Sequence, residues 1–134
     1  MQDLIKNEKF LIVKTVKSFI LDLENLLKTF PKKDMYTKNM VYRDALAVLE
    51  LINKANYEGR KELKLTFQIE ALAKINKIDF YLERAYKLKY ISEKQCLHAC
   101  SKLVKLGKMI YAWCNNAWTF KYNKSFIYIW KWNK

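Results

Sequence analysis

Glycine and proline are nearly absent from this chain. Of 134 residues, two are glycine, Gly59 and Gly107, and one is proline, Pro31. An all-β domain needs many turns and uses these residues to make them, so their scarcity predicts a helical protein. A chain of this length also fits a single domain with one hydrophobic core. The sequence therefore predicts one all-α domain.

Apolar periodicity predicts the first two helices. From about residue 7 to residue 29, apolar side chains recur every three or four positions, and Pro31 then stops the helix. A polar connection follows before a second apolar stripe, which starts at Tyr42. The stretch "NYEG", residues 56–59, ends this second helix, with Gly59 expected in a left-handed cap.

Two further helices complete the predicted bundle. The third runs from about residue 60 to residue 89. The fourth opens at "YISEKQ", residues 90–95, where Ser92 is the expected N-cap and Gln95 completes a capping box. Four helices of similar length joined by short connections predict an up-down-up-down four-helix bundle over residues 1–118.

The third helix is apolar over more of its circumference than one core requires. A single core covers an arc of about 100°, and the apolar side chains here extend past both edges of that arc. Such a helix is expected to contact a second subunit. The residues predicted at this oligomer interface are Phe67, Ile69, Ile78 and Phe80.

The last residues, 119–134, do not continue the helical pattern. Aromatic side chains alternate there as they do in strands, and lysines separate them. This basic aromatic tail is expected to form a short β-hairpin or an irregular appendage to the bundle.

The net charge points to a polyanionic partner. Lysine and arginine total 26 against 13 acidic residues, which gives +13, and no acidic residue follows Glu93. Both a nucleic acid and an acidic protein fit such a surface.

The start of the chain lacks a signal-peptide pattern, no apolar run could span a membrane, and three cysteines suggest a reducing compartment. The cytoplasm is the expected location.

No catalytic or metal site is expected. Cys96, His98 and Cys100 have metal-binding side chains, but on a helix His98 projects about 200° away from Cys96, so the cysteines are better explained as small core residues. A single histidine gives little basis for nucleophilic catalysis. Asp79, the one acid on the inner side of the third helix, is expected to be a buried, hydrogen-bonded residue. No enzyme activity and no cofactor are therefore predicted.

A basic face of the third helix is the predicted nucleic-acid contact. At helical spacing, three cations and one aromatic ring fall within about 80° of one another, on the side away from the core. An ordinary solvated helix face explains the same pattern, and lysines of the first helix, Lys14, Lys17 and Lys28, are an alternative surface. The predicted site consists of Lys74, Lys77, Tyr81 and Arg84, with Lys87 as a weaker member.

Several stretches resemble one known family. They are "TFPKKDMYTKN" between the first two helices, "ELINKANY" at the end of the second, "RKELKL" and "IDFYLERAYKLKYISEKQ" in and after the third, and "LGKMIYAW" in the fourth. In this order and spacing they resemble the Avd family, the accessory variability determinants of diversity-generating retroelements. The resemblance covers about residues 8–118.

The resemblance implies a basic homopentamer of four-helix subunits without a catalytic site. Such a protein associates with the retroelement's reverse transcriptase and its template RNA, with DNA as a further ligand, and supports mutagenic cDNA synthesis. Two alternatives remain: the four-helix proteins encoded in ribosomal-RNA intervening sequences, which share the "YIS" turn, and a structural scaffold without a nucleic-acid role. The "TFPKKDMYT" loop favours the accessory proteins.

Overall fold

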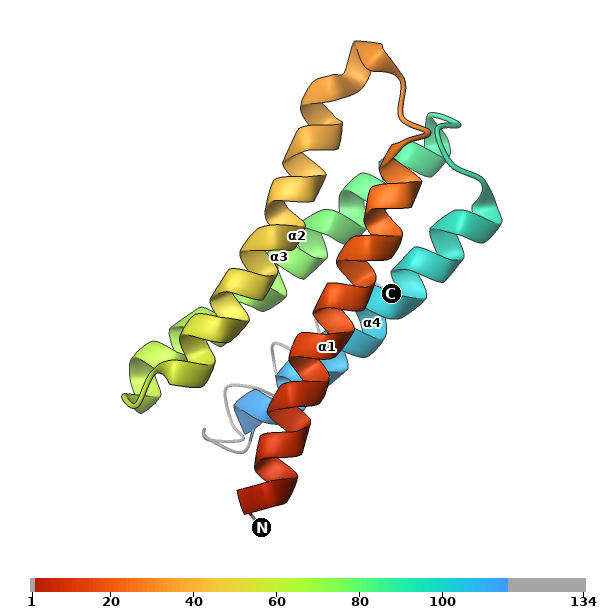
Figure 1. Ribbon diagram of the computed structural model, residues 1–134. Helices are drawn as coiled ribbons and strands as arrows, with labels where there is room; N and C mark the ends of the chain where they lie inside the picture. Colours follow the sequence, from red (N-terminus) through yellow and green to blue (C-terminus); the bar gives the residue numbers. More distant parts are fainter. Residues whose placement is uncertain (1, 116–134) are drawn as a thin grey trace.

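In the computed structural model, residues 2–115 of the chain are described, and side chains are described from residue 11 onward. The elements in chain order are α1 (Gln2–Leu27), the short 3₁₀ helix η1 (Lys32–Asp34), α2 (Met35–Tyr57), α3 (Lys61–Lys87) and α4 (Glu93–Asn115). Figure 1 shows the four long helices side by side, each running opposite to the one before it. The prediction of an all-α four-helix bundle is confirmed.

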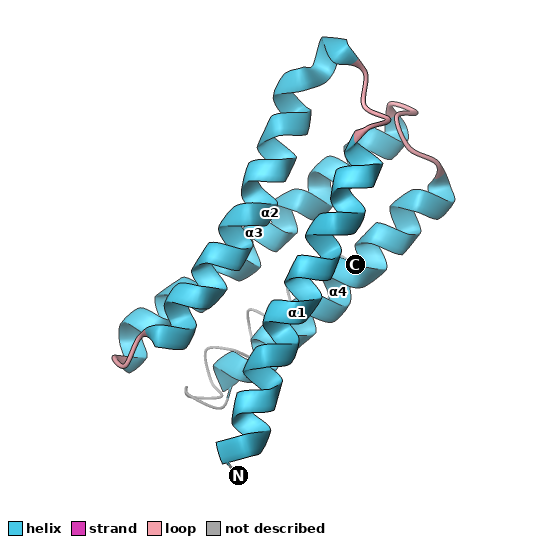
Figure 2. Cartoon of the chain, viewed as in Figure 1, coloured by secondary structure: helices cyan, strands magenta, loops and turns pink. Residues whose placement is uncertain are grey.

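Each helix packs against two neighbours. Contacts join α1 to α2, α2 to α3, α3 to α4, and α4 back to α1, so the bundle closes on itself. All regular structure within residues 2–115 is helical (Figure 2). The predicted tail at 119–134, and the domain boundary proposed there, lie outside the described residues.

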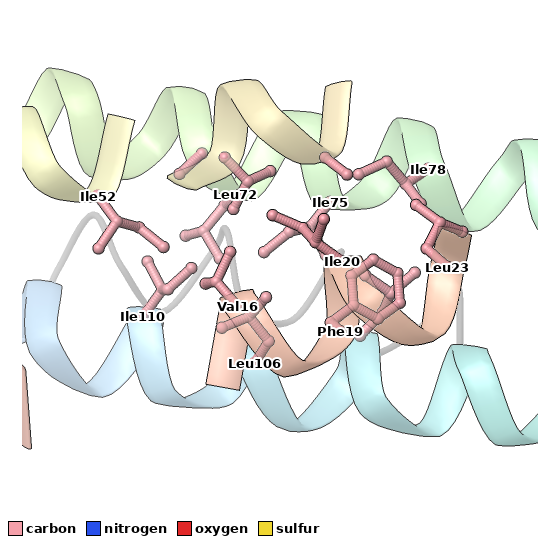
Figure 3. Packing of buried hydrophobic residues seen from close by; sticks show 14 of the residues in the cluster. Val16, Phe19, Ile20, Leu23, Ile52, Leu72, Ile75, Ile78, Leu106 and Ile110 are labelled. Atoms are coloured by element: carbon pink, nitrogen blue, oxygen red, sulfur yellow. The ribbon is translucent and has the colours of Figure 1, made fainter. Parts of the chain in front are cut away.

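All four helices contribute to one core (Figure 3). Ile75 and Ile78 of α3 and Ile110 of α4 are fully buried, and Val16 and Leu23 of α1 are buried to nearly the same extent. Burying one such side chain stabilises the fold by roughly 1.5–3 kcal/mol relative to leaving it in water. This shared core fixes which helix edges remain available at the surface.

Helix α2 begins earlier than its apolar stripe suggested. The sequence predicted a polar connection up to Tyr42, but the helix starts at Met35, after the turn that Pro31 and η1 form. Thr37 and Val41 are already buried within its first two turns. A buried threonine does not register in a search for apolar periodicity, so the first turns of this helix were missed.

The two turns at the ends of α3 differ from expectation. Gly59 does not adopt a left-handed conformation, since no glycine among the described residues has a positive φ. The left-handed residue is instead Lys89, with φ 67°. Its N–H donates to the Tyr86 carbonyl, and the Tyr90 N–H donates to the Ala85 carbonyl, which is the Schellman arrangement at a helix end. The predicted cap at Gly59 is therefore wrong.

The predicted capping box at the start of α4 is confirmed. The Ser92 N–H donates to Gln95 Oε1 at 2.8 Å, and the Gln95 N–H donates to Ser92 Oγ at 3.1 Å. These two bonds satisfy backbone donors that the helix itself leaves open.

Candidate nucleic-acid interface

The predicted basic residues of α3 contact α2 instead of forming an open face. Lys74 Nζ lies 3.4 Å from Oδ1 of Asp44, and Lys77 Nζ lies 3.3 Å from Oδ2 of the same carboxylate. The Asp44 side chain is only 8% exposed, and the two lysine side chains are 39% and 40% exposed. The expectation that these lysines point away from the rest of the bundle is therefore wrong. A helical wheel gives the angle of a side chain but does not say which neighbouring helix covers it.

Tyr81 and Arg84 extend the same contact line. The Tyr81 hydroxyl lies 3.9 Å from the Met40 sulfur, and its ring packs against the core. Arg84 Nη1 lies 3.1 Å from Oδ2 of Asp34 and 3.5 Å from the Thr37 hydroxyl. The ring of Tyr81 is thus occupied by packing, and the Arg84 charge is already paired.

Lys87 is the exception within the predicted site. Its side chain is exposed, and no residue in the described part of the chain pairs with it. Lys87 lies in the last turn of α3, where a positive charge interacts favourably with the helix dipole. Of the five residues predicted on this helix, it is the one fully available to a ligand.

Asp34 ties together three segments at one end of the bundle. Besides the contact with Arg84, its Oδ2 accepts a hydrogen bond from the Tyr90 hydroxyl at 2.8 Å. Hydrogen bonds from Thr37, Tyr90 and Arg84 lower the pKa of Asp34 to about 2. The same hydrogen bond raises the pKa of Tyr90. This cluster is a structural anchor, because every charge in it is matched.

The predicted interface residues separate into three locations. Phe80 is 60% exposed and Ile69 is half-buried, and by helical geometry the two lie about 20° apart, on one side of α3. Phe67 is half-buried about 140° from Phe80 around the helix, and it borders a hollow of about 720 Å³ on α2. Ile78 is fully buried within the core of the bundle, so the prediction that it lies at an interface is wrong.

The hollow beside Phe67 has apolar and polar side chains of α2 in its lining. Leu46, Leu49 and Tyr57 contribute apolar surface, and Glu50, Asn53 and Lys54 contribute polar groups. Leu46 and Tyr57 are both exposed, Tyr57 to 86%. The exposed apolar side chains among the described residues therefore include one surface around Phe80 and another around Tyr57.

The cysteine and histidine side chains diverge. Cys96 is buried and Cys100 half-buried, with their sulfurs 3.9 Å apart, whereas His98 borders a hollow between α4 and α1. Burial, reinforced by the nearby Asp79 carboxylate, raises the pKa of the Cys100 thiol. Among the side chains of residues 11–115, no three His, Cys, Asp or Glu groups come together as a metal site would require.

A second basic surface lies at the seam between α1 and α4. The sequence predicted Lys14 as part of an alternative surface, but not the lysines of α4 that lie beside it. A hollow of about 260 Å³ lies between these helices, lined by Leu11, Lys14, Thr15, Ser18, Lys102 and Lys105. Lys102 pairs with Asp22, one turn further along α1. The absence of acidic residues after Glu93 was the available signal, but it did not reveal which helix lies beside α4.

Comparisons with known proteins support the fold alone. No protein-family model matches the sequence, and no curated protein matches it. Among solved structures, a protein of unknown function from the S23 ribosomal protein family of Bacteroides thetaiotaomicron is similar, with a TM-score of 0.72 and 16% identity. The match covers 78% of this chain and 98% of that one.

None of the described helices combines the length and apolarity that crossing a membrane requires.

Proposed function

We propose that this chain is a non-catalytic RNA-binding accessory protein of a diversity-generating retroelement. It would associate in the cytoplasm with the reverse transcriptase and the template RNA and support mutagenic cDNA synthesis. The observation that carries the proposal is the surplus of positive charge, +13 in 134 residues, on a four-helix bundle. A surplus of this size exceeds what solubility needs and favours a polyanionic ligand. The ordered sequence stretches that resemble the Avd family select the retroelement.

The proposal includes a homo-oligomeric ring. The apolar surfaces around Phe80 and around Tyr57 are different patches on one subunit. A two-fold dimer pairs a patch with itself, whereas two different patches that pair head to tail generate a ring when the rotation closes. Exposed apolar surface of this kind on a soluble subunit favours such a contact. The number five comes from the family resemblance.

The ring is tested by a charge placed in one patch. Phe80→Glu should dissociate the assembly, because the carboxylate would be buried without a partner. Leu21→Glu is the matched control, since Leu21 is equally exposed, at 62%, but lies on α1. Light scattering reads the mass of each variant. A wild-type monomer at micromolar concentration contradicts the ring.

The RNA-binding role is tested with the purified wild-type protein. It should shift template RNA in a gel, with affinity that falls steeply as salt rises, and it should co-purify with the reverse transcriptase. A neighbouring reverse-transcriptase gene with paired variable and template repeats is the genomic counterpart of this test. Absence of RNA binding at low salt contradicts the proposal.

The alternative is a four-helix protein of the ribosomal-RNA intervening-sequence type. The similar fold of a protein from the S23 ribosomal protein family fits either role, because 16% identity carries information on fold alone. Binding to ribosomal RNA in preference to the template RNA, without co-purification of a reverse transcriptase, would favour this alternative. Failure to bind any RNA would favour a structural scaffold.

A further inference from the structure

A row of hollows follows the seam between α1 and α4, and we call this row the α1–α4 groove. Three adjoining hollows, of about 80, 260 and 190 Å³, follow one another along it. Lys102 borders both the first and the second hollow, and Leu11 borders both the second and the third. Figure 1 shows α1 and α4 side by side along this line. The groove therefore runs from His98 at one end to Ala112 at the other.

The middle of this groove is lined by cations and hydroxyl groups. Lys14 and Lys105 are exposed, and neither has an acidic partner among residues 11–115. Thr15 donates its hydroxyl proton to the Leu11 carbonyl at 2.7 Å, which leaves its oxygen free to accept, while Ser18 has a hydroxyl that can donate. Among the side chains of residues 11–115, no carboxylate lines the middle hollow, and Asp22 pairs with Lys102 at its border.

This environment contrasts with that of the lysines on α3. Lys74 and Lys77 share one carboxylate, so they bring only one net positive charge to the surface. Lys14 and Lys105 each bring a full positive charge to the hollow. Lys102 adds a third ammonium group, which can contact a phosphate while it remains paired with Asp22. Counterion release on binding phosphates depends on such unpaired cations.

We infer that the α1–α4 groove binds the phosphodiester backbone of a single RNA strand, through Lys14, Lys102 and Lys105. The inference rests on the proposed RNA-binding function and locates that function on this chain. Packed helices lie with their axes only about 8–10 Å apart, so the groove admits one extended strand and excludes a duplex. The third hollow, which has apolar side chains including Leu11 and Ala112, offers contact to sugars and bases.

The test compares two variants that remove the same charge. Lys14→Gln/Lys105→Gln empties the groove of its unpaired cations. Lys33→Gln/Lys61→Gln removes two exposed lysines outside the groove. Binding of a fluorescent oligouridine is measured by anisotropy over a range of salt concentrations, and circular dichroism verifies that both variants remain folded.

The groove variant should bind about tenfold or more weakly, and its log–log salt slope should fall by roughly 1.4, since each lost contact on a single strand contributes about 0.7. The control should lose less than about threefold. If the wild type binds and both variants lose equally, the groove assignment is overturned while the proposed function stands. If the wild type binds no RNA, the proposed function itself is overturned.

Two more arms use the same proteins. Oligouridine carrying 4-thiouridine should cross-link to the α1 and α4 residues that line the groove, and cross-links confined to other helices overturn the assignment. Poly-glutamate should bind the wild type more weakly than RNA does. If poly-glutamate binds as tightly, and with the same loss in the groove variant, the groove recognises acidic protein and the phosphodiester assignment is overturned.

Discussion

Lys74 and Lys77 should stabilise the bundle as a pair, because they share one buried carboxylate. Lys74 supplies the hydrogen bond to Oδ1 of Asp44, and Lys77 lies beside Oδ2, which has no hydrogen-bond donor in the described structure. The carboxylate is only 8% exposed, so water compensates little if both cations are removed. We therefore expect the effects of Lys74→Met and Lys77→Met to be strongly non-additive.

The magnitudes follow from exposure. Each lysine side chain is about two-fifths exposed, which discounts the attraction, so one substitution should cost about 0.5 kcal/mol while the other cation remains. The double substitution leaves a buried charge without a partner and should cost about 2–3 kcal/mol, toward the lower end of values for breaking buried pairs. The coupling energy is then about 1–2 kcal/mol.

Urea unfolding at neutral pH and fixed protein concentration measures these values, since oligomerisation makes stability depend on concentration. Adding Asp44→Asn to the double variant is the control. Neutralising the carboxylate should restore about 1–2 kcal/mol, because an amide is less costly to bury than an unpaired charge. A double variant whose cost equals the sum of the two single costs would refute the shared-carboxylate reasoning, and so would an Asp44→Asn change that restores nothing.

Further predictions concern the two turns, the pH dependence of stability and the core. Gly59→Ala should stabilise the protein by about 0.5 kcal/mol, because the φ of Gly59 is not positive and an added Cβ meets nothing within 4 Å. Lys89→Gly should stabilise it by about 1 kcal/mol, because glycine adopts the left-handed conformation of residue 89 without strain. If urea unfolding shows either variant to be less stable than the wild type, the turn assignment is contradicted. The pKa of Asp34 is lowered from 3.8 to about 2 in the folded protein, so its contribution to stability is present above pH 3.8 and is lost as pH falls through 2. The melting temperature of Asp34→Asn should therefore decrease less between pH 4 and pH 2 than that of the wild type. Equal decreases in the two proteins would contradict this. Leu103→Ala should cost about 3 kcal/mol in urea unfolding, because Leu103 is fully buried, and a cost below about 1 kcal/mol would contradict its place in the core.

Local patterns predicted the helices well, because helical periodicity and capping act within a few residues. The box at Ser92 and Gln95 formed as its spacing indicated. The left-handed position was misassigned because a glycine is permitted to adopt that conformation but is not required to. At Lys89 the tertiary structure imposes the conformation on a residue that disfavours it.

The surface was harder to predict, because it depends on which helix edges meet. Lys74 and Lys77 looked solvated on a wheel of α3 alone, and their partner is an acid on α2. Asp44 interrupts the apolar stripe of α2 between Val41 and Val48, and this interruption was the one local hint that a cation lies opposite. The juxtaposition of Lys14 and Lys105 likewise requires knowing that α4 returns to α1.

The anchor at Asp34 makes the two ends of the bundle unequal. It links the connection before α2 to the last turn of α3 and to the turn before α4, which meet at one end of the molecule in Figure 1. At the opposite end, Arg60, the N-cap residue of α3, makes no side-chain capping hydrogen bond, and a Cβ added at Gly59 would meet nothing within 4 Å. Of the two ends, amide hydrogens around residues 58–61 should therefore exchange with solvent before those near Asp34. Among the turns that the structure describes, transient opening would start at this one, and a protease would cut there before it cuts near Asp34.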